Sequence, residues 1–314
     1  MLISIIIPTH DRVGLLEQAL ESMSQVETDG LPEIELVVIQ NCPGDGTKEL
    51  VDRMASRFPW ACRSVEETRK GSCPARNRGI QETRGEIVVF TDDDVSFHPG
   101  WLKAIAKAFE DPQVGMVGGR VLPRFSCPIP SWFSLERFPG VCVCYDLGEN
   151  GVTLEETHPM PYSANAALRR TVLDEIGGFR TDLGRIPGRL LGAEDTDFLL
   201  RAVRTGTTAR YVPDALVYHP IGEDRLNREF VRLWIADGGI CWARFRFEQE
   251  KTFSRLFGVP RHMVKTFGVN LLKWFAALVL LRTKDRFFYR MEICYCRNFC
   301  REFRRLVRDN RKNT

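Results

Sequence analysis

Short apolar runs alternate with amphipathic stretches along the first 120 residues of the chain. The runs are rich in β-branched residues, which is typical of buried strands, and the stretches between them carry apolar side chains at helical spacing. The predicted strands are residues 2–7, 34–39, 87–90 and 114–117, and the predicted helices are residues 13–23, 47–56, 74–83 and 101–109. This alternation predicts an α/β fold whose mostly parallel sheet is covered by helices.

The pattern loosens between residues 123 and 161, where six prolines and three glycines interrupt any long element. We interpret this stretch as an insertion that faces a substrate. Regular patterns then predict helices at residues 170–176 and 195–204 and a strand at residues 215–218. From residue 225 to the end the pattern is helical, so a domain boundary is expected near residue 224.

Composition and charge narrow the class of protein. Hydrophobic residues make up 44% of the chain and charged residues 27%, which excludes a disordered protein. The net charge is +3, but residues 282–314 hold eleven Lys or Arg against four Asp or Glu, a net of +7, which leaves 3 − 7 = −4 for the rest. The basic tail predicts attraction to anionic lipid or another acidic partner. A basic excess confined to a tail does not fit nucleic-acid binding.

The C-terminal third offers two interpretations. Residues 267–281 are apolar but interrupted by Asn270 and Lys273, and they fall short of the roughly 20 residues that a membrane-spanning helix needs. This segment either packs on the body of the protein or lies in a membrane interface, where Trp274, Phe287, Phe288 and Tyr289 would be the anchors. The basic excess favours the membrane.

The N-terminus and the cysteines indicate a compartment. The chain starts with Met1 and an apolar strand, without the features of a signal peptide. The ten cysteines form no repeating framework, and those at positions 294, 296 and 300 match no zinc spacing. We therefore expect free thiols in a cytoplasmic protein that is peripheral on the cytosolic face of a membrane.

Polar clusters follow three of the predicted strands. They are residues 8–12, residues 40–41 and the triplet of residues 92–94. Because ligands bind at the carboxyl ends of strands in open α/β sheets, these clusters should converge. Asp92 and Asp94 can point the same way in extended backbone and hold a divalent cation such as Mg²⁺ with substrate phosphates. The alternative is a solvated acidic loop before the helix at residue 101.

Other candidates carry two interpretations each. Glu194 and Asp195 open a predicted helix, either as favourable charges in its first turn or as a general base facing the crevice. His219 ends a strand, where it is either structural or a metal ligand. Arg76 and Asn77 either bind phosphate and base or cap and solvate their helix.

Seven motifs, in order, resemble the family 2 glycosyltransferases, which are nucleotide-sugar enzymes of the GT-A fold. They are IIIPTHDR (5–12), DGT (45–47), ARNRG (75–79), FTDDD (90–94), SANAALRR (163–170), LDEIGGF (173–179) and GAED (192–195). The resemblance covers about residues 2–220 and is highly specific because all seven occur in order. It implies a GT-A domain at residues 1–224, with a nucleotide-sugar half at about 1–120 and an acceptor half at about 121–224. The basic helical extension at residues 225–314 would follow it.

The resemblance also implies roles for single residues. Asp195 would be the catalytic base, with Glu194 as the alternative, in an inverting single displacement by a hydroxyl of a glycan or lipid-linked acceptor. Mn²⁺ or Mg²⁺ would be held by Asp94, Asp92 and His219. The residues expected around the nucleotide sugar are Pro8, Thr9, Asp11, Arg12, Gln40, Asn41, Arg76, Asn77, Asp92 and Asp93. The family usually has an acid where Gln40 stands, which weakens the expectation of UDP relative to GDP or dTDP.

Three other classes of protein fit the sequence less well. A nucleotidyltransferase would carry a glycine-rich basic phosphate loop after the first strand, where residues 8–12 stand instead. An NAD-dependent oxidoreductase would show Gly-x-Gly-x-x-Gly there, and it is absent. A non-catalytic membrane adaptor agrees with the basic, aromatic C-terminal third, but the intact acids at positions 92, 94, 194 and 195 argue against it.

Overall fold

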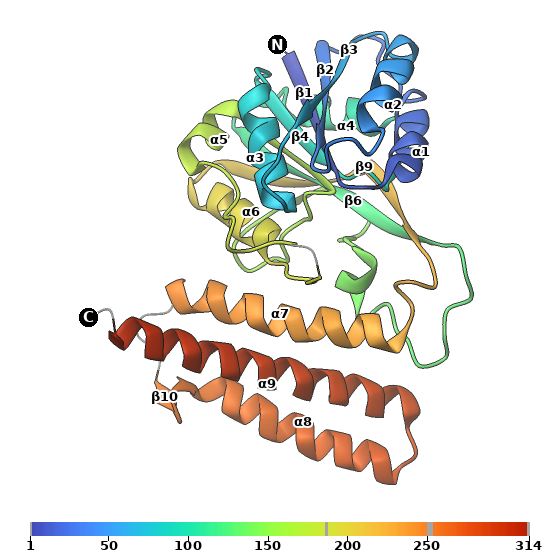
Figure 1. The fold of residues 1–314 in the computed structure, drawn as a ribbon. Coiled ribbons are helices and arrows are strands. Elements are labelled where there is room, and N and C mark those ends of the chain that lie inside the picture. The colour runs from blue at the N-terminus through green and yellow to red at the C-terminus, as the bar shows by residue number, and fades with distance from the viewer. Residues whose placement is uncertain (1, 186–187, 250–253, 313–314) are drawn as a thin grey trace. The chain divides into compact units, whose positions relative to one another are not determined.

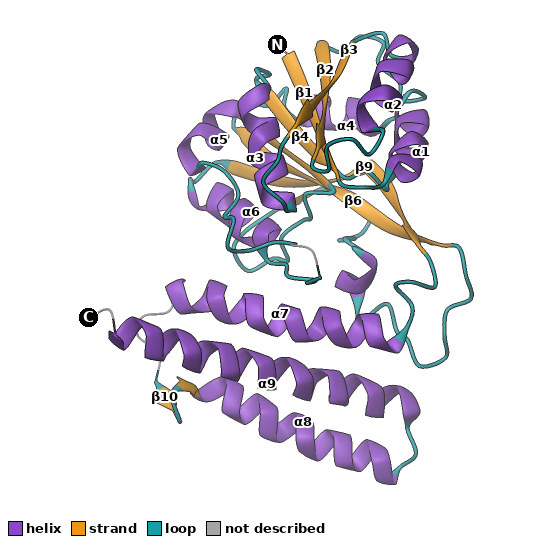
Figure 2. Ribbon diagram, viewed as in Figure 1, coloured by secondary structure: helices purple, strands orange, loops and turns teal. Residues whose placement is uncertain are grey.

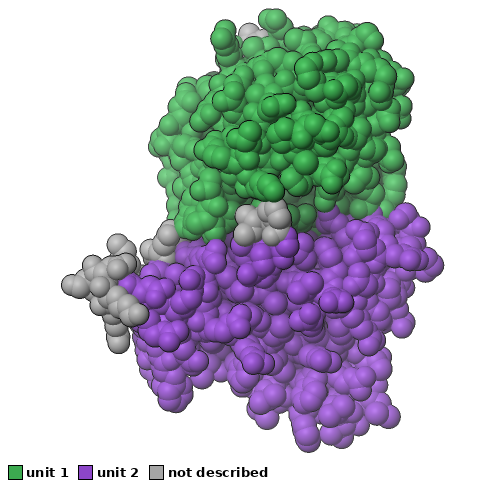
Figure 3. Space-filling view, in the orientation of Figure 1, with its two compact units in different colours: residues 1–124, 143–187, 194–220 green, residues 125–142, 188–193, 221–314 purple. Residues whose placement is uncertain are grey.

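The computed structural model describes residues 2–185, 188–249 and 254–312, which fall into two compact units (Figure 3). Unit 1 comprises Met1–Arg124, Val143–Pro187 and Glu194–Pro220, and unit 2 comprises Phe125–Cys142, Gly188–Ala193 and Ile221–Thr314. The units interleave along the chain, because two segments of the expected acceptor half group with the C-terminal helices. The functional division at residue 224 stays a prediction.

Unit 1 is built on a nine-stranded sheet of order β3-β2-β1-β4-β8-β6-β9-β5, with β7 paired to β9. The strands are β1 (Leu2–Thr9), β2 (Glu33–Gln40), β3 (Ala61–Glu66), β4 (Ile87–Thr91), β5 (Ser96–Phe97), β6 (Val114–Phe125), β7 (Val152–Thr153), β8 (Asn165–Arg169) and β9 (Thr208–Ile221). Strands β1 to β4 pair in parallel. Strand β8 runs antiparallel to β4 and β6, and β5 and β7 run antiparallel to β9.

Helices cover both faces of this sheet (Figures 1 and 2). They are α1 (Val13–Met23), α2 (Thr47–Met54), α3 (Ser72–Glu82), α4 (Trp101–Ala108), α5 (Arg170–Ile176) and α6 (Glu194–Arg204). Helices α1 and α2 lie on one face, while α3, α5 and α6 lie on the other, as right-handed crossovers require when the strand order reverses after β3. Helix α3 packs closely on β1 because Gly79 has no side chain: a Cβ there would lie 2.4 Å from Ile6 Cγ2.

The predicted α/β fold is confirmed, and the predicted strands and helices of unit 1 are present. The β-branched residues of β1, β2 and β4 are buried, as expected. Strands β3, β5, β7 and β8 were not predicted, and β6 and β9 extend well beyond the predicted 114–117 and 215–218. The short 3₁₀ segment Ala55–Arg57 takes the place of the end of the predicted helix 47–56, and a second one is found at Pro139–Cys142.

Asn165, the first residue of β8, joins helix α4 to the strands β6 and β9. Its Oδ1 accepts a hydrogen bond from Trp101 Nε1 of α4 at 2.8 Å. Its Nδ2 donates to the carbonyl oxygens of Arg120 in β6 and Ala215 in β9, at 2.9 and 2.7 Å. Asn165 is fully buried, so these bonds replace water for all three partners.

We expect Asn165→Ala to lower the free energy of unfolding by about 3 kcal/mol, because one buried N–H and two buried carbonyls lose their partner. Urea unfolding followed by fluorescence measures this change. Asn298→Ala is the control, since Asn298 only bonds within its own helix and part of it is exposed; it should change stability by less than about 1 kcal/mol. Equal losses in both variants would contradict a special role for Asn165.

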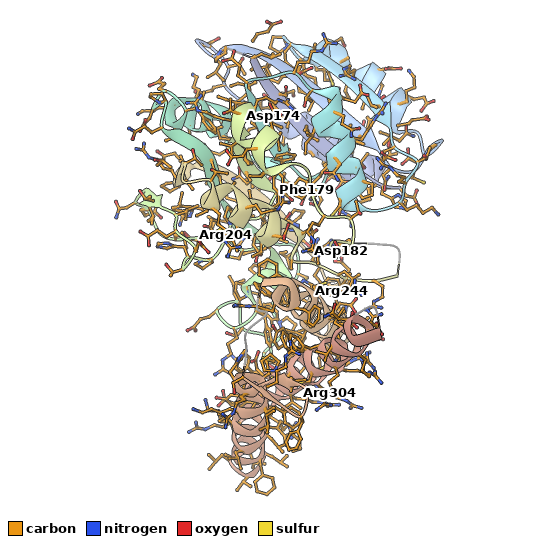
Figure 4. The ribbon with its side chains drawn as sticks, turned by 90° about the vertical axis from the view of Figure 1, so that its left-hand side faces the viewer. Asp174, Phe179, Asp182, Arg204, Arg244 and Arg304 are labelled. Atoms are coloured by element: carbon orange, nitrogen blue, oxygen red, sulfur yellow. The ribbon has the colours of Figure 1, made fainter. Side chains whose placement is uncertain are left out.

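Unit 2 is a bundle of α7 (Arg228–Gln249), α8 (Arg261–Val279) and α9 (Thr283–Lys312), with a small hairpin of β10 (Arg255–Leu256) and β11 (Val259–Pro260). Helix α9 packs against both α7 and α8. The core of this bundle contains Cys296, Phe299 and Phe303. Arg244 of α7 donates a hydrogen bond to Glu302 of α9 at 2.9 Å. The positions of Arg244 and Arg304 are labelled in Figure 4.

Residues 125–142 pack on the start of α9 through aromatic rings. Trp132 lies 4.6 Å from Phe287, and Phe138 lies 5.7 Å from Phe288, between ring centroids. Phe287 and Phe288, expected as membrane anchors, are therefore engaged within unit 2. Across the ranges that the structure describes, no helix combines the length and apolar character needed to cross a bilayer.

Candidate active site

The predicted convergence of polar residues is confirmed by the register of the parallel strands. Thr9 of β1 pairs with Gln40 of β2, and Ile6 of β1 pairs with Phe90 of β4. The three strands therefore end at one edge of the sheet. There Thr9 Oγ1 donates a 2.7 Å hydrogen bond to Asp93 Oδ2, which joins the first cluster to the aspartate triplet.

Asp93 is the buried centre of this contact. Arg12 reaches both Asp93 Oδ1 at 3.3 Å and Asp94 Oδ2 at 3.2 Å. Burial, together with the neighbouring charge of Asp94, raises the pKa of Asp93 to about 7, although Arg12 and Thr9 oppose the shift. Arg12 thus neutralises the triplet from the solvent side.

Asp94 and His219 meet although they come from distant parts of the chain. Strand β5 pairs with β9 so that Ser96 lies opposite Tyr218. As a result His219 Nε2 lies 3.5 Å from Asp94 Oδ1. His219 Nδ1 lies 3.0 Å from the carbonyl oxygen of Pro220, and a hydrogen bond donated there leaves the Nε2 lone pair towards Asp94.

This pair suits a divalent cation. A carboxylate oxygen and a neutral imidazole whose second nitrogen is fixed by a carbonyl can both ligate Mn²⁺, whereas Mg²⁺ would rely on the carboxylate and on phosphate oxygens. Asp92, the third expected ligand, instead bonds to Arg76. Among the described residues no group of three or more His, Cys, Asp or Glu side chains is arranged to hold a metal by itself.

Arg76 is a buried cation at the centre of the site. Its Nη2 donates to Asp92 Oδ1 at 2.8 Å, and its Nη1 lies 3.8 Å from Glu194 Oε1. The guanidinium lies 5.6 Å from the ring of Phe179, which is labelled in Figure 4. Although burial opposes it, the charge of Arg76 holds the pKa of Asp92 below its usual value.

Two nitrogens of Arg76, Nε and Nη1, are buried and donate no hydrogen bond to any described residue. An unsatisfied buried guanidinium is costly, and an anionic group with several oxygens would satisfy it. Arg76 is therefore suited to bind a phosphate or a similar anion.

Glu194 and Asp195 form the start of α6 and sit beside Arg76. Burial and the charge of Asp195 raise the pKa of Glu194 to about 7, while Arg76 lowers it in part. Burial also raises the pKa of Asp195, against the effects of Arg76 and Ser163. Ala193, directly before them, has φ 80°, a strained conformation for a residue with a side chain. Burial thus favours the protonated form of both acids, which stand at the fixed start of α6.

Other expected nucleotide contacts are occupied by the protein. Asn41 bonds to the backbone of Glu67, Arg69 and Gly71. Asn77 bonds to the backbone N–H and carbonyl of Phe179. These two amides fix loops around the site, and direct contacts from them to a nucleotide stay predictions.

Asp45 organises the loop beside β2. It accepts hydrogen bonds from Gln40 Nε2, from the backbone N–H of Thr47 and from the backbone N–H of Asp11. Pro8 lies at the end of β1, half-buried. The expected base-reading region is therefore shaped by Asp45 rather than by Gln40 alone.

Sequence reasoning did not single out Ser163 and Arg185. The positive charge of Arg185 lowers the pKa of Asp92 and of Glu194. Ser163 stabilises the charge on Asp195. Ser163 lies in a motif that the resemblance contained, but Arg185 stands in a loop without any repeating pattern, so only the folded chain brings it to the acids.

The comparisons with known proteins agree with this site. The model of the family described as Glycosyl transferase family 2 matches residues 4–177, more than half of the chain. The chain belongs to glycosyl transferase family 2. It is therefore a glycosyltransferase, and its β1–β4 strand ends and aspartate triplet lie inside the matched range.

Curated relatives of this glycosyltransferase cover most of its length. The chain is 26% identical over 245 residues to Glycosyltransferase AglE of Haloferax volcanii, covering 75% of each chain. It is 27% identical to the Glucosyl-dolichyl phosphate glucuronosyltransferase of the same organism, over 74% of this chain and 73% of the relative. The Uncharacterized glycosyltransferase YwdF of Bacillus subtilis is 33% identical over 69% of this chain and 74% of its own.

Solved structures share the fold. Mannosyltransferase PcManGT from Pyrobaculum calidifontis, in complex with GDP-Man and Mn²⁺, aligns over 96% of this chain and 86% of its own with a TM-score of 0.62 and 21% identity. TarS 1–349 of S. aureus, in complex with UDP-GlcNAc, aligns over 94% and 91% with a TM-score of 0.56 and 16% identity. The glycosyltransferase therefore has the GT-A fold that its motifs predict.

Proposed function

We propose that this glycosyltransferase transfers a sugar, with inversion, from a nucleoside diphosphate sugar to a hydroxyl of a glycan or lipid-linked acceptor. UDP-sugar is the expected donor. The observation that carries the proposal is the meeting of Asp94 and His219, 3.5 Å apart, at the sheet edge that also holds the buried Arg76. A pair of side chains that can ligate a metal ion, beside an arginine with two nitrogens that donate no hydrogen bond to the described residues, is suited to a diphosphate.

Each group has a role that follows from its position. Arg76 would bind diphosphate oxygens through Nε and Nη1, the two nitrogens without partners. Asp94 and His219, with Asp92 nearby, would hold Mn²⁺ or Mg²⁺, which supplies charge neutralisation for the departing diphosphate. Thr9 and Arg12 would keep the triplet in place. The Mn²⁺ complex of the mannosyltransferase PcManGT supports this choice of cation.

Asp195 would remove the proton from the acceptor hydroxyl. A base must be within hydrogen-bonding reach of that hydroxyl and must be a carboxylate when it acts. Asp195 Oδ1 is buried and has no hydrogen-bond partner among the described residues, so one of its oxygens is available. Glu194 is the alternative base, because it shares the same turn of α6.

The acceptor assignment rests on relatives. Their names include a transferase acting on glucosyl-dolichyl phosphate and a succinoglycan biosynthesis protein, ExoM, of Rhizobium meliloti. Both support an acceptor in glycolipid or polysaccharide assembly, and the proposal extends this class to the present chain.

The test is calorimetric titration of the purified protein with UDP, GDP and dTDP, each with and without Mn²⁺. One nucleoside diphosphate should bind at least about 10-fold more tightly when Mn²⁺ is present, because Asp94 and His219 would hold the cation, which would neutralise charge on the diphosphate. The nucleotide that binds also identifies the donor class. Well-folded protein that binds none of the three would rule out the proposed donor site.

A further inference from the structure

The helical unit contains a basic pocket that the proposed reaction does not use. A cavity of about 230 Å³ lies where the start of α7, the end of α8 and the start of α9 meet. Arg228 of α7 and Arg286 and Arg290 of α9 line it, together with Trp274 and Thr283. Among the residues that the structure describes, no acidic side chain lines this cavity.

The three arginines of this pocket are exposed, and Arg228 also lies over the rings of Trp132 and Phe287. Within the described part of the chain, none of its three arginines forms an ion pair. Trp274 Nε1 is buried without a hydrogen-bond partner among the same residues. Asp285, the nearest acid along α9, is bonded to Arg137 at 2.7 Å. Thr283 begins α9, a 30-residue helix whose N-terminus also favours an anion. This combination suits a phosphate group.

An exposed apolar face continues from the pocket along α8. Leu272 is 73% exposed, Phe275 60% and Leu281 82%. Exposed apolar side chains on this scale are unusual unless they meet another apolar surface. The face also borders a second, shallow cavity of about 560 Å³, which combines Leu256 and Val269 with Arg261 and Lys265.

The charge around this face indicates which kind of surface it can contact. Residues 254–284 contain six Lys or Arg and no Asp or Glu. A second copy of this face would bring its own basic residues against these. Another protein would need an acidic surface to bind here. A bilayer with anionic lipids offers both an apolar interior and a negative surface, and amphipathic helices with basic borders lie in such an interface.

We propose that α8 lies in the surface of an anionic bilayer and that the pocket of Arg228, Arg286 and Arg290 binds the phosphate of a lipid headgroup. Leu272, Phe275 and Leu281 then enter the acyl region beside the bound headgroup. This inference concerns unit 2 alone and does not depend on the proposed donor, acceptor or base.

The test is flotation of the full chain with vesicles at low salt, where charge attraction is strongest. Vesicles of phosphatidylcholine alone are compared with vesicles in which about 30% of the lipid is the anionic phosphatidylglycerol. Wild type should float with the anionic vesicles only. Arg286→Gln with Arg290→Gln should weaken binding about 30-fold, because each basic side chain near an anionic surface contributes roughly fivefold.

A matched control separates the pocket from general charge. Arg297→Gln with Arg308→Gln removes the same charge from two other exposed positions of α9 that do not line the cavity. It should weaken binding less than about threefold if the pocket is specific. Leu280→Ser with Leu281→Ser should reduce vesicle binding while leaving binding of short soluble phosphates unchanged. Equal effects of the two arginine pairs would overturn the pocket assignment.

Three further outcomes would overturn the proposal. One is failure of wild type to float with anionic vesicles. Another is a dimer in light scattering that Leu280→Ser with Leu281→Ser dissociates, which would show that a second copy covers α8. The last is binding of glycerol phosphate in solution without any vesicle binding, which would identify a site for a free phosphate. The donor-site variant Asp94→Ala should float like wild type, so failure of the donor proposal remains distinguishable.

Discussion

Asp94→Ala should abolish the Mn²⁺-dependent part of nucleoside diphosphate binding and lower turnover at least about 100-fold. The reason is positional: Asp94 is the carboxylate of the triplet that faces His219 Nε2, at 3.5 Å. Asp92 is bonded to Arg76 and Asp93 to Thr9, whereas Asp94 bonds to Arg12 through its other oxygen, Oδ2. Even residues behind a metal ligand change affinity by 10- to 100-fold, so loss of a ligand should cost at least as much. Calorimetry with and without Mn²⁺ measures the binding, and a coupled diphosphate-release assay measures turnover.

The control for this variant is Asp52→Ala. Asp52 is an exposed acid on α2 that pairs with Lys48, so its loss should leave binding and turnover unchanged. Thermal unfolding should show that both variants remain folded. Mn²⁺-dependent binding that survives in Asp94→Ala would show that the cation is held elsewhere.

Asp195→Asn should reduce kcat by about 10²- to 10⁴-fold while nucleotide affinity changes little, because a missing general base affects proton transfer and not donor binding. Glu194→Gln should reduce kcat much less. Both substitutions are isosteric, so the start of α6 should persist. The reverse order of effects would assign the base to Glu194, and a loss of nucleotide binding in Asp195→Asn would indicate a structural role instead.

The pH profile checks the same assignment. Because the pKa of Glu194 is raised to about 7 and that of Asp195 is also raised, the pair carries a proton below neutrality. A base must be deprotonated, so kcat should rise as pH increases through about 7. Glu194→Gln removes a neighbouring negative charge and should move this rise to lower pH. A wild-type profile flat from pH 6 to 8 would contradict the coupling.

The parallel half of the sheet was predictable because its signal is local. Leu2–Thr9, Glu33–Gln40 and Ile87–Thr91 carry dense β-branched residues between clear turns, and their polar ends had to converge once the strands were parallel. Strand β8 gave no such signal, since Asn-Ala-Ala-Leu-Arg has little strand propensity. Its place is fixed by pairing with β4 and β6, which no window of sequence contains.

The same distinction applies to the site. Asp94, Glu194, Asp195 and His219 were found as strand-end or helix-start residues, but their partners depend on tertiary contacts. Asp92, expected at both the cation and the nucleotide, bonds to Arg76 in the folded chain, and its contact with a cation stays a prediction. Trp132 and Phe138 sit in a proline-rich stretch, and their contacts with Phe287 and Phe288 could not be read from local patterns. Phe287 and Phe288, named as anchors in the membrane interpretation, therefore also pack within unit 2, and their contact with a membrane stays a prediction.

The pairing of β5 with β9 has a consequence for biosynthesis. The nascent chain emerges N-terminus first, so the strands β1 to β4 and the aspartate triplet leave the ribosome long before His219. Until β9 has been translated and has paired with β5, His219 cannot lie beside the triplet. Helix α6 leaves the ribosome only shortly before β9. A ribosome-bound intermediate would thus hold the first strands of the sheet without a complete cation site, and a chain stalled or cleaved before residue 208 would be unable to acquire one.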